Sequence, residues 1–315
     1  MKVLVTGGAG FIGFNLVKVL LDKNINVVVV DNYLKGKKEN TICFKDNLNY
    51  EFYNLDISNT KAFCNTFKDE HFDIIYHLAA NTDIRIGESD SNTDYKNTFK
   101  TTISVLELMK KSNIKNLFFA STSAIYGSKS GLLNEQVGDL RPISYYGSAK
   151  LASENFIFSY SHMNDLNALI FRFPNVIGPN ITHGVIYDFY NKLMANSTCL
   201  EILGDGCQTK PYMYVSDLID AIIFFTIEKN IKKGINIYNI GVDTSTSVND
   251  IANIICEELG YKDVLYKYTG GKIGWKGDIP KFQFDLEKIH KEGWNAKYTS
   301  DEAVKLTIKN MKGKK

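Results

Sequence analysis

The chain has 315 residues, of which 44% are hydrophobic and 23% charged, and its 37 basic and 35 acidic residues leave a formal net charge of +2. This composition is typical of a globular protein with a substantial core, and it excludes a disordered or fibrous chain. Because the charges of both signs are mixed along the chain, we expect no nucleic-acid partner and no attachment to a membrane.

The cysteines and the apolar segments indicate the compartment. Five scattered cysteines without a CxxC spacing predict neither a disulfide framework nor a zinc site, so we expect no metal. The first apolar run ends at Gly7 and Gly8 and is therefore too short to be the apolar core of a signal peptide. The apolar stretch 221–227 is too short to span a bilayer and predicts a buried helix. We therefore expect a cytoplasmic protein.

Short β-branched runs alternate with longer segments of helical period. Strands that alternate with helices are the signature of a parallel sheet covered on both faces. The continuous apolar run 27–30 is typical of a strand buried on both sides. The sequence therefore predicts an α/β fold with a Rossmann-type doubly wound parallel sheet. Its expected strands are residues 3–6, 26–31, 50–54, 73–77, 116–120, 168–171 and 237–240.

The rhythm changes after Pro174, where loops rich in Asn, Gly and Pro interrupt a helical piece near 187–194. We expect this material to form a smaller, mixed lobe over the carboxyl ends of the strands, where ligands of open α/β sheets bind. The expected division is a main Rossmann domain of residues 1–173 plus about 206–262, and a substrate-binding lobe of about 174–205 plus 263–315.

The first strand runs into a glycine-rich segment, 7–13, and then into a helical pattern. Glycine at such a turn allows a tight bend, close approach of the backbone to a pyrophosphate, and close packing of helix on strand. The helix N-terminus adds free N–H groups and the positive end of its dipole. A glycine turn alone is weak evidence for a dinucleotide site. Asp31 strengthens it, because it ends the second strand near the ~20-residue spacing from the glycines at which a carboxylate binds the adenosine ribose.

The surroundings of Asp31 favour NAD as the cofactor. A carboxylate there repels the 2′-phosphate of NADP, and no Arg follows it directly, although Lys35, Lys37 and Lys38 leave NADP open. Asp56, after the third strand, is placed to face the adenine, and a helix cap before Ser58 is the alternative role.

Tyr146 and Lys150 lie four residues apart, on one face if the segment is helical. A nearby ammonium stabilises phenolate and lowers the pKa of Tyr from ~10, which makes it a usable general base. The fifth strand is expected to end at Ala120, followed by an exposed run of hydroxyls, 121–123. Such runs are often loops or caps. Here a hydroxyl beside the phenol can hold a substrate alcohol while hydride leaves to the nicotinamide.

With these features in this order, the sequence resembles the extended short-chain dehydrogenase/reductase family, in particular its nucleotide-sugar epimerase and dehydratase branch. The resemblance covers nearly the whole chain. Its marks are residues 7–13, 31–32, 56–57, 77–80, 97, 121–127, 146–150, 172–179 and 204–217.

The resemblance implies three sets of site residues. The catalytic hydroxyl, base and pKa-tuning lysine would be Thr122, Tyr146 and Lys150. The NAD-binding residues would be Gly7, Gly10, Phe11, Ile12, Gly13, Asp31, Asn32, Asp56, Ile57, Leu78, Ala79, Ala80, Asn97, Tyr146, Lys150 and Pro174. The residues that bind a nucleotide-diphosphate sugar would be Thr82, Ser123, Asn175, Gly204, Lys210, Tyr212 and Lys276.

The resemblance also bears on setting and assembly. His77, at a strand end, is expected to be structural. The helices near 97–110 and 146–162 would pair across a homodimer interface, and polysaccharide biosynthesis is the usual setting of the family.

Departures from the family pattern narrow the reaction. Resembling dehydratases and decarboxylases carry acids where this chain has Ser123 and Ala124, which argues against loss of water. Lys210 and Lys276 stand where many relatives have Arg. Because lysine lacks the bidentate fork with which Arg binds a phosphate, the sequence does not determine which nucleotide the substrate carries. We predict oxidation at sugar C4, most simply in a 4-epimerase. A 4-dehydrogenase that releases the keto sugar and a non-catalytic NAD-binding regulator are the alternatives.

Overall fold

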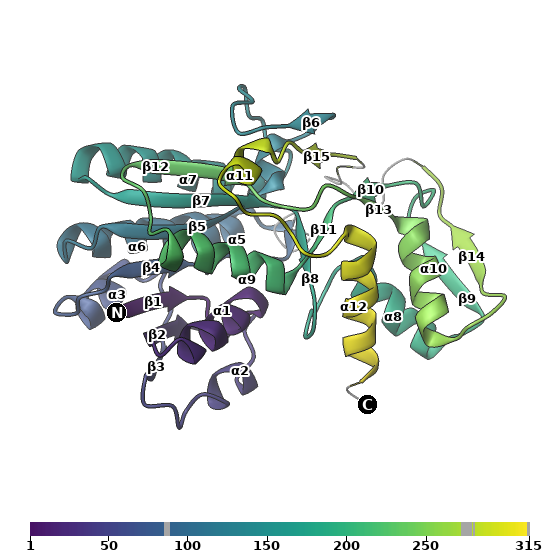
Figure 1. Ribbon diagram of the computed structural model, residues 1–315, viewed down its shortest axis with the longest axis horizontal. Coiled ribbons are helices and arrows are strands. Elements are labelled where there is room, and N and C mark those ends of the chain that lie inside the picture. The colour runs from purple at the N-terminus through teal and green to yellow at the C-terminus, as the bar shows by residue number, and fades with distance from the viewer. Residues whose placement is uncertain (85–88, 272–278, 280, 314–315) are drawn as a thin grey trace. The chain divides into compact units, whose positions relative to one another are not determined.

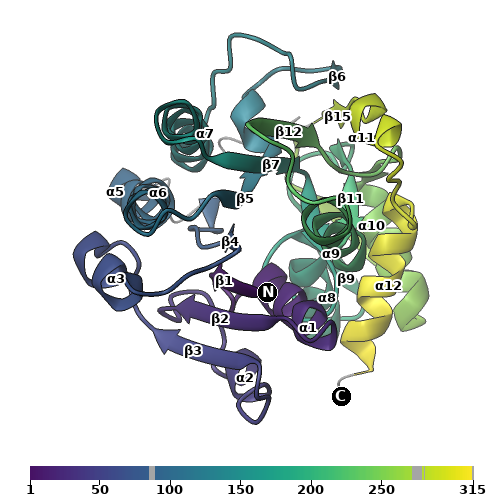
Figure 2. The same cartoon turned by 60° about the vertical axis from the view of Figure 1, so that its left-hand side comes forward.

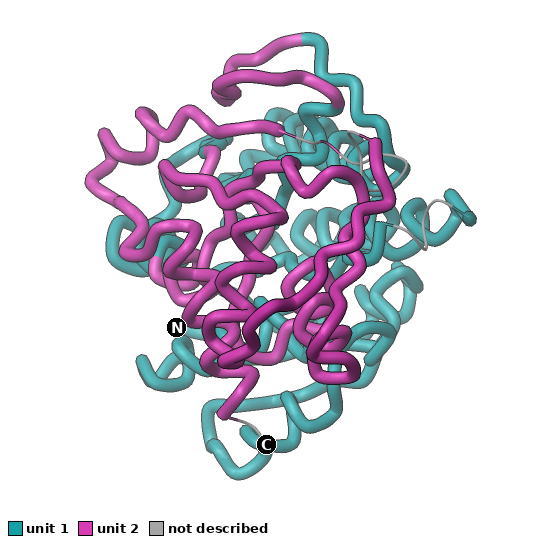
Figure 3. The backbone as a smooth tube through the Cα atoms, turned by 90° about the vertical axis from the view of Figure 1, so that its right-hand side faces the viewer, with its two compact units in different colours: residues 1–127, 139–172, 221–238 teal, residues 128–138, 173–220, 239–315 magenta. Residues whose placement is uncertain are grey.

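The computed structural model describes residues 1–84, 89–271, 279 and 281–313. The chain forms two compact units (Figure 3). Unit 1 consists of residues 1–127, 139–172 and 221–238, and unit 2 of residues 128–138, 173–220 and 239–315. Segments 128–138, 206–220 and 239–262, which we expected in the main domain, thus lie in unit 2.

Unit 1 is built on a seven-stranded sheet with the strand order β12-β7-β5-β4-β1-β2-β3 (Figure 1). The pairs β1–β2, β2–β3, β1–β4 and β4–β5 are parallel. Each of the seven expected strands is present, which confirms the predicted fold. Their bounds are β1 (Lys2–Thr6), β2 (Asn26–Asp31), β3 (Tyr50–Asn54), β4 (Ile74–His77), β5 (Asn116–Thr122), β7 (Asn167–Phe173) and β12 (Ile235–Asn239).

Helices cover both faces of this sheet. Helices α3, α6 and α7 lie along one face and α1 lies along the other (Figure 2). The first face buries Val28, Val30 and Phe119 of the sheet against Phe63 of α3 and Leu106 of α6. The helical segments of this unit are α1 (Phe11–Asp22), α2 (Glu39–Ile42), α3 (Thr60–Phe67), α5 (Ser91–Asp94), the π-helical η1 (Tyr95–Phe99), α6 (Lys100–Lys111), the 3-10 turn η2 (Ser123–Tyr126), α7 (Tyr145–Asn164) and the π-helical η3 (Phe224–Glu228).

The strand order reverses between β1 and β4, which pair in parallel register from Val3 with Ile74 to Thr6 with His77. In open α/β sheets the crevice at such a reversal, outside the carboxyl ends of the strands, is where ligands bind. The glycine segment follows β1 and residues 78–80 follow β4, so two of the predicted NAD-binding segments emerge side by side at this point.

Unit 2 is a mixture of helices and short strand pairs. Strands β8 and β11, β9 and β14, and β6 and β15 pair in parallel, whereas β10 and β13 pair antiparallel. Asp217 accepts backbone hydrogen bonds from Lys297 (2.9 Å) and Tyr298 (3.1 Å), which fixes the segment before α12. The elements are β6 (Leu132–Leu133), β8 (Asn175–Ile177), α8 (Val185–Ala195), β9 (Cys199–Ile202), β10 (Thr209–Lys210), β11 (Tyr212–Tyr214), β13 (Thr246–Ser247), α10 (Val248–Leu259), β14 (Leu265–Tyr268), β15 (Gln283–Phe284), α11 (Glu287–Lys291) and α12 (Ser300–Lys312).

Helix α9 (Val215–Ile223) runs from unit 2 into unit 1 and continues as η3, so the predicted helix at 221–227 is present. Across the residues that the structure describes, no helix is both long and apolar enough to cross a membrane.

Candidate functional site

The turn between β1 and α1 leaves no room for a side chain at Gly7 or Gly13. Gly7 has φ +76°, and a Cβ on it would lie 2.7 Å from the backbone nitrogen of Ala79. A Cβ on Gly13 would lie 2.2 Å from the carbonyl oxygen of Gly7. Gly10 is the N-cap of α1, where no side chain caps the helix and no acid occupies the first turn, which contains Phe11 and Ile12. The first-turn N–H groups are therefore suited to receive an anion.

Asp31 stands beside this turn at the end of β2. Its carboxylate accepts backbone hydrogen bonds from Ala9 (3.0 Å) and Tyr33 (2.7 Å). Burial raises the pKa of Asp31, and these two hydrogen bonds oppose the shift. The neighbouring Asn32 accepts a hydrogen bond from the backbone of Leu34 (3.0 Å). A fixed carboxylate next to an uncapped helix end fits the adenosine ribose and pyrophosphate of NAD.

Asp56 does not cap a helix, because the N-cap of α3 is Asn59. One oxygen of Asp56 accepts a hydrogen bond from the backbone of Ser58 (2.9 Å), and the other lies 3.3 Å from the ammonium of Lys96. Burial raises the pKa of Asp56, but the hydrogen bonds with Ser58 and the contact with Lys96 outweigh this effect, so the pKa is lowered overall. Ile57 beside it is 5% exposed.

The remaining predicted NAD-binding residues of unit 1 follow β4 or lie in η1. Leu78, Ala79 and Ala80 are half-buried directly after β4. Asn97 is half-buried in η1, where its carbonyl oxygen accepts a hydrogen bond from Thr101 (3.3 Å).

Tyr146 lies in the first turn of α7, as the Tyr/Lys spacing predicts. Ser144 is the N-cap and accepts a hydrogen bond from the backbone of Gly147 (3.1 Å). A Cβ on Gly147 would lie 2.8 Å from the carbonyl oxygen of Ala124, so glycine lets α7 approach η2 closely. This contact brings Tyr146 beside the hydroxyl segment.

Lys150 lies one turn further along α7 and is 2% exposed. Its ammonium donates to the carbonyl oxygen of Ala120 (2.6 Å) and lies 6.0 Å from the centre of the Tyr146 ring. Burial lowers the pKa of Lys150 to about 7, and the charge of Glu154 opposes that shift. A buried cation at this distance favours ionisation of the phenol.

The pKa of Tyr146 is raised in this structure, not lowered as the spacing to Lys150 led us to expect. Burial raises it to about 12, a hydrogen bond with Thr122 opposes the increase, and the charge of Asp94 adds to it. The hydroxyl of Thr122 thus acts on the phenol of Tyr146, as expected for a hydroxyl and a base that share one substrate alcohol.

The hydroxyl segment differs from the prediction in one respect. Strand β5 continues through Ser121 and Thr122, which are 0% and 9% exposed, so the expected exposed run after Ala120 is wrong. The hydroxyls are buried because each has a partner. Ser121 donates to Glu154, and Thr122 accepts from the backbone of Ala124 (3.2 Å). Ser123 begins η2 and is half-buried.

His77 agrees with a structural role. Its two ring nitrogens lie 2.8 Å from the hydroxyl of Thr6 and 3.0 Å from that of Thr102. Burial, with a contribution from the charge of Lys150, lowers the pKa of His77 to about 3, which keeps the ring neutral.

The predicted substrate-binding residues are divided between the units. In unit 1, Thr82 is exposed in the loop after β4. In unit 2, Asn175 is exposed at the start of β8, and Lys210 is half-buried in β10; Pro174, which was predicted to bind NAD, is buried beside Asn175. The backbone of Tyr212 donates to Ser300 (3.1 Å), and Gly204 has φ +80°. Lys276 lies outside the described residues.

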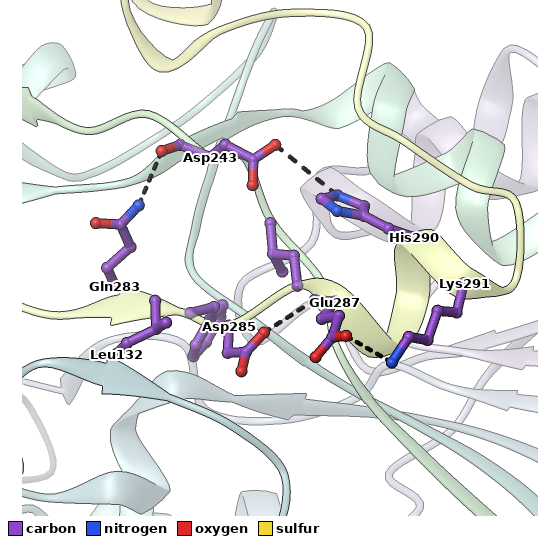
Figure 4. Close-up of a pocket in the computed structure, with 9 residues that line it drawn as sticks. Leu132, Asp243, Gln283, Asp285, Glu287, His290 and Lys291 are labelled. Carbon is purple, nitrogen blue, oxygen red and sulfur yellow. Dashed lines mark hydrogen bonds and ion pairs between the residues drawn. The ribbon is translucent and has the colours of Figure 1, made fainter.

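A pocket in unit 2 is lined by none of these residues (Figure 4). Its polar groups engage one another. Gln283 donates to the carbonyl oxygen of Asp243 (2.8 Å), His290 lies 3.8 Å from the Asp243 carboxylate, and Lys291 pairs with Glu287 (2.5 Å). Because these contacts satisfy the lining charges, the pocket carries no function in our account.

The sequence did not indicate two groups that lie close to the predicted catalytic residues. Glu154 contacts Ser121, and its position four residues after Lys150 was an available signal, because that spacing places both on one helix face. Asp94 is 1% exposed, accepts from Asn81 (2.9 Å), and keeps its other oxygen buried without a hydrogen-bond partner in the described structure. No sequence signal marks Asp94.

Comparison with known proteins extends these observations. Residues 3–241 match the model of the NAD dependent epimerase/dehydratase family. A putative UDP-glucose 4-epimerase of Methanocaldococcus jannaschii is 31% identical over 98% of both chains. The solved UDP-glucuronic acid 4-epimerase of Bacillus cereus, in complex with UDP-glucuronic acid and NAD, is 27% identical over 99% of both chains, with a TM-score of 0.88. Human dTDP-D-glucose 4,6-dehydratase is 29% identical over 98% of this chain and 87% of its own.

Proposed function

This chain belongs to the NAD dependent epimerase/dehydratase family, and within it we propose that the protein is a nucleotide-sugar 4-epimerase. Membership makes it an NAD-dependent enzyme of the extended short-chain dehydrogenase/reductase type, as the sequence predicted. The proposal is carried by the position of Tyr146 in the first turn of α7, with the buried ammonium of Lys150 6.0 Å from its ring centre and with α7 packed closely on the turn that follows Thr122.

The residues that would hold NAD lie around the β1–β4 reversal. The N–H groups of the first turn of α1 would receive the pyrophosphate, and Asp31 would accept hydrogen bonds from the adenosine ribose. Asn32, Asp56 and Ile57 would flank the adenine. When bound, NAD supplies a reversible hydride acceptor.

Tyr146 would act as the general base. Its Oη would take the proton of the sugar C4 hydroxyl, while the hydroxyl of Thr122 holds the same oxygen in place. Lys150 would stabilise the phenolate, because its cation lies beneath the ring. On the return step Tyr146 would give the proton back to the C4 oxygen of a keto sugar that has turned over in the site, so that hydride returned to C4 on the opposite face would invert that carbon.

The absence of an acid beside Thr122 favours epimerisation over dehydration. Ser123 and Ala124 occupy the positions at which the resembling dehydratases and decarboxylases carry carboxylates, so no group of the hydroxyl segment is equipped to expel water. Retention of Thr122, Tyr146 and Lys150 together argues against a non-catalytic regulator.

A UDP-sugar is the proposed substrate, because two of the similar proteins described above are named for UDP-sugars. Thr82 and Ser123 of unit 1 would contact the sugar. In unit 2, Asn175 and Lys210 would contact the diphosphate, and the loop from Gly204 to Tyr212 would enclose the nucleotide. Unit 1 would thus supply most of the cofactor-binding residues and unit 2 most of the substrate-binding residues, although unit 2 includes segments that we expected in the main domain.

We also propose a homodimer through α6 and α7. The side chain of Phe156 on α7 is 44% exposed and stacks edge-on against Phe99 of η1, with ring centres 5.1 Å apart. Tyr95, 55% exposed, extends this apolar surface. Paired helices would cover it. A cytoplasmic location and a role in polysaccharide biosynthesis fit the same proposal.

A substrate screen tests the proposed function. The purified protein with NAD is incubated separately with UDP-, GDP- and dTDP-hexoses, the products are resolved by proton NMR, and absorbance at the NADH band is followed. A 4-epimer without lasting absorbance is the expected result with a UDP-sugar. Stoichiometric NADH with a released keto sugar would assign a 4-dehydrogenase instead, and no change with any sugar would refute an enzyme of this class.

A further inference from the structure

Helix α7 carries a second buried charge one turn beyond Lys150. Glu154 is 1% exposed, and Arg172 at the end of β7 is 4% exposed. Two parallel hydrogen bonds join them, from Nε to Oε1 (3.1 Å) and from Nη2 to Oε2 (2.6 Å). This bidentate geometry fixes both side chains in orientation as well as in distance.

The same pair holds both ends of the segment that contains Thr122. The hydroxyl of Ser121, immediately before Thr122, donates to Oε1 of Glu154. At the other end, Nη1 of Arg172 donates to the hydroxyl of Tyr126 (3.0 Å), and the guanidinium carbon lies 5.3 Å from the centre of that ring. Thr122 therefore lies between two residues that are tied to one ion pair.

Lys150 belongs to the same arrangement. Its ammonium donates to the carbonyl oxygen of Ala120, the residue before Ser121. Lys150 and Glu154 thus bind consecutive residues of β5 from consecutive turns of α7. A shift of α7 along β5 would break both contacts and would move Tyr146, which lies on the same helix.

Stability alone does not account for this pair. Removing two charges from water is costly, and replacing a buried ion pair by apolar residues of similar volume is often neutral or stabilising. Here the pair links α7, the end of β5 and the end of β7, and all three lie at or beside the catalytic residues.

We propose that Glu154 and Arg172 are positioning residues, which hold Thr122 and Lys150 in the geometry that Tyr146 needs for proton transfer. This inference rests on the proposed function, because it takes the roles of those three residues from it. Neither Glu154 nor Arg172 is assigned a contact with substrate or cofactor.

The test replaces both charges at once, as Glu154→Met with Arg172→Met, because a single replacement would leave the other charge buried without a partner. We expect a melting temperature close to that of the wild type, because removal of the buried charges offsets the loss of partners for the hydroxyls of Ser121 and Tyr126. The NAD dissociation constant should stay within about threefold of the wild-type value. We expect kcat to fall on the order of 100-fold, with KM nearly unchanged, as a displacement of roughly 1 Å in a catalytic group would produce.

A second variant keeps the ion pair and removes only its ties to the hydroxyl segment. Ser121→Ala with Tyr126→Phe deletes two hydroxyls and should lower kcat in the same way; it also keeps the proposal testable if the double methionine variant does not fold. The matched control is Glu107→Gln on α6, which loses the carboxylate that accepts from Tyr160, further along α7. The control should retain wild-type kcat.

The outcomes separate the inference from the proposed function. Suppose that the wild type converts a sugar nucleotide and Tyr146→Phe does not. If either double variant, correctly folded, then has a kcat within twofold of the wild type, the positioning role is overturned and the proposed function is not. If the wild type converts no sugar nucleotide, the proposed function is overturned and the inference with it.

Discussion

Replacing Gly13 by alanine tests how the phosphate turn is built. The new Cβ would lie 2.2 Å from the carbonyl oxygen of Gly7, well inside any real contact, so the turn must open by roughly 1 Å. Overpacking of this kind costs about 1–3 kcal/mol, and each kcal/mol lowers the melting temperature of a domain of this size by about 2–4 °C. The displaced turn should also weaken NAD binding by on the order of 100-fold.

Gly10→Ala is the matched control for this prediction. Its Cβ would lie 3.3 Å from the same oxygen, which only a small adjustment relieves. The melting temperature should therefore hardly change, although NAD binding should weaken about tenfold if the pyrophosphate approaches the backbone there. Scanning calorimetry and titration calorimetry with NAD measure both quantities. A Gly13→Ala protein with wild-type stability and affinity would refute the steric reasoning.

Three further substitutions address the cofactor and the base. Asp31→Ala should relax the preference for NAD over NADP by at least about tenfold, because it removes the charge that repels a 2′-phosphate; equal preference ratios in wild type and variant would contradict the ribose role. Tyr146→Phe should retain NAD binding while kcat falls about 10²–10⁴-fold, the usual contribution of a general base, and an active variant would eliminate Tyr146 as the base. Asp94→Asn removes a charge that raises the pKa of Tyr146, so the limb of the pH–rate profile on which activity rises with phenol ionisation should move to lower pH. An unmoved or alkaline-shifted limb would disprove the coupling.

The sequence predicted the sheet well because its strands are marked locally. The β-branched runs that form β1 and β2 have the bounds that the pattern indicated, to within a residue, and the glycine turn follows from steric needs that only glycine meets. Tyr146 and Lys150 were found for a similar reason, since their helical spacing is short-range information.

The rest depends on contacts between residues far apart in the chain. Ser121 and Thr122 were expected to be exposed because hydroxyls after an apolar strand are usually solvated. The burial of Ser121 is explained by its partner Glu154, 33 positions later in the chain. The family resemblance includes Arg172, but it implied no role for this residue. The buried carboxylate of Asp94 accepts a hydrogen bond from Asn81, and nothing in the local sequence pattern predicts that contact.

The central claim is that hydride leaves C4 and returns to it within one binding event. UDP-glucose labelled with deuterium at C4 tests this directly, with the label in the product followed by NMR and mass spectrometry. Our account predicts a 4-epimer that retains the deuterium at C4 without lasting absorbance at the NADH band. Deuterium lost to solvent, or accumulated in NADH with release of a keto sugar, would contradict it.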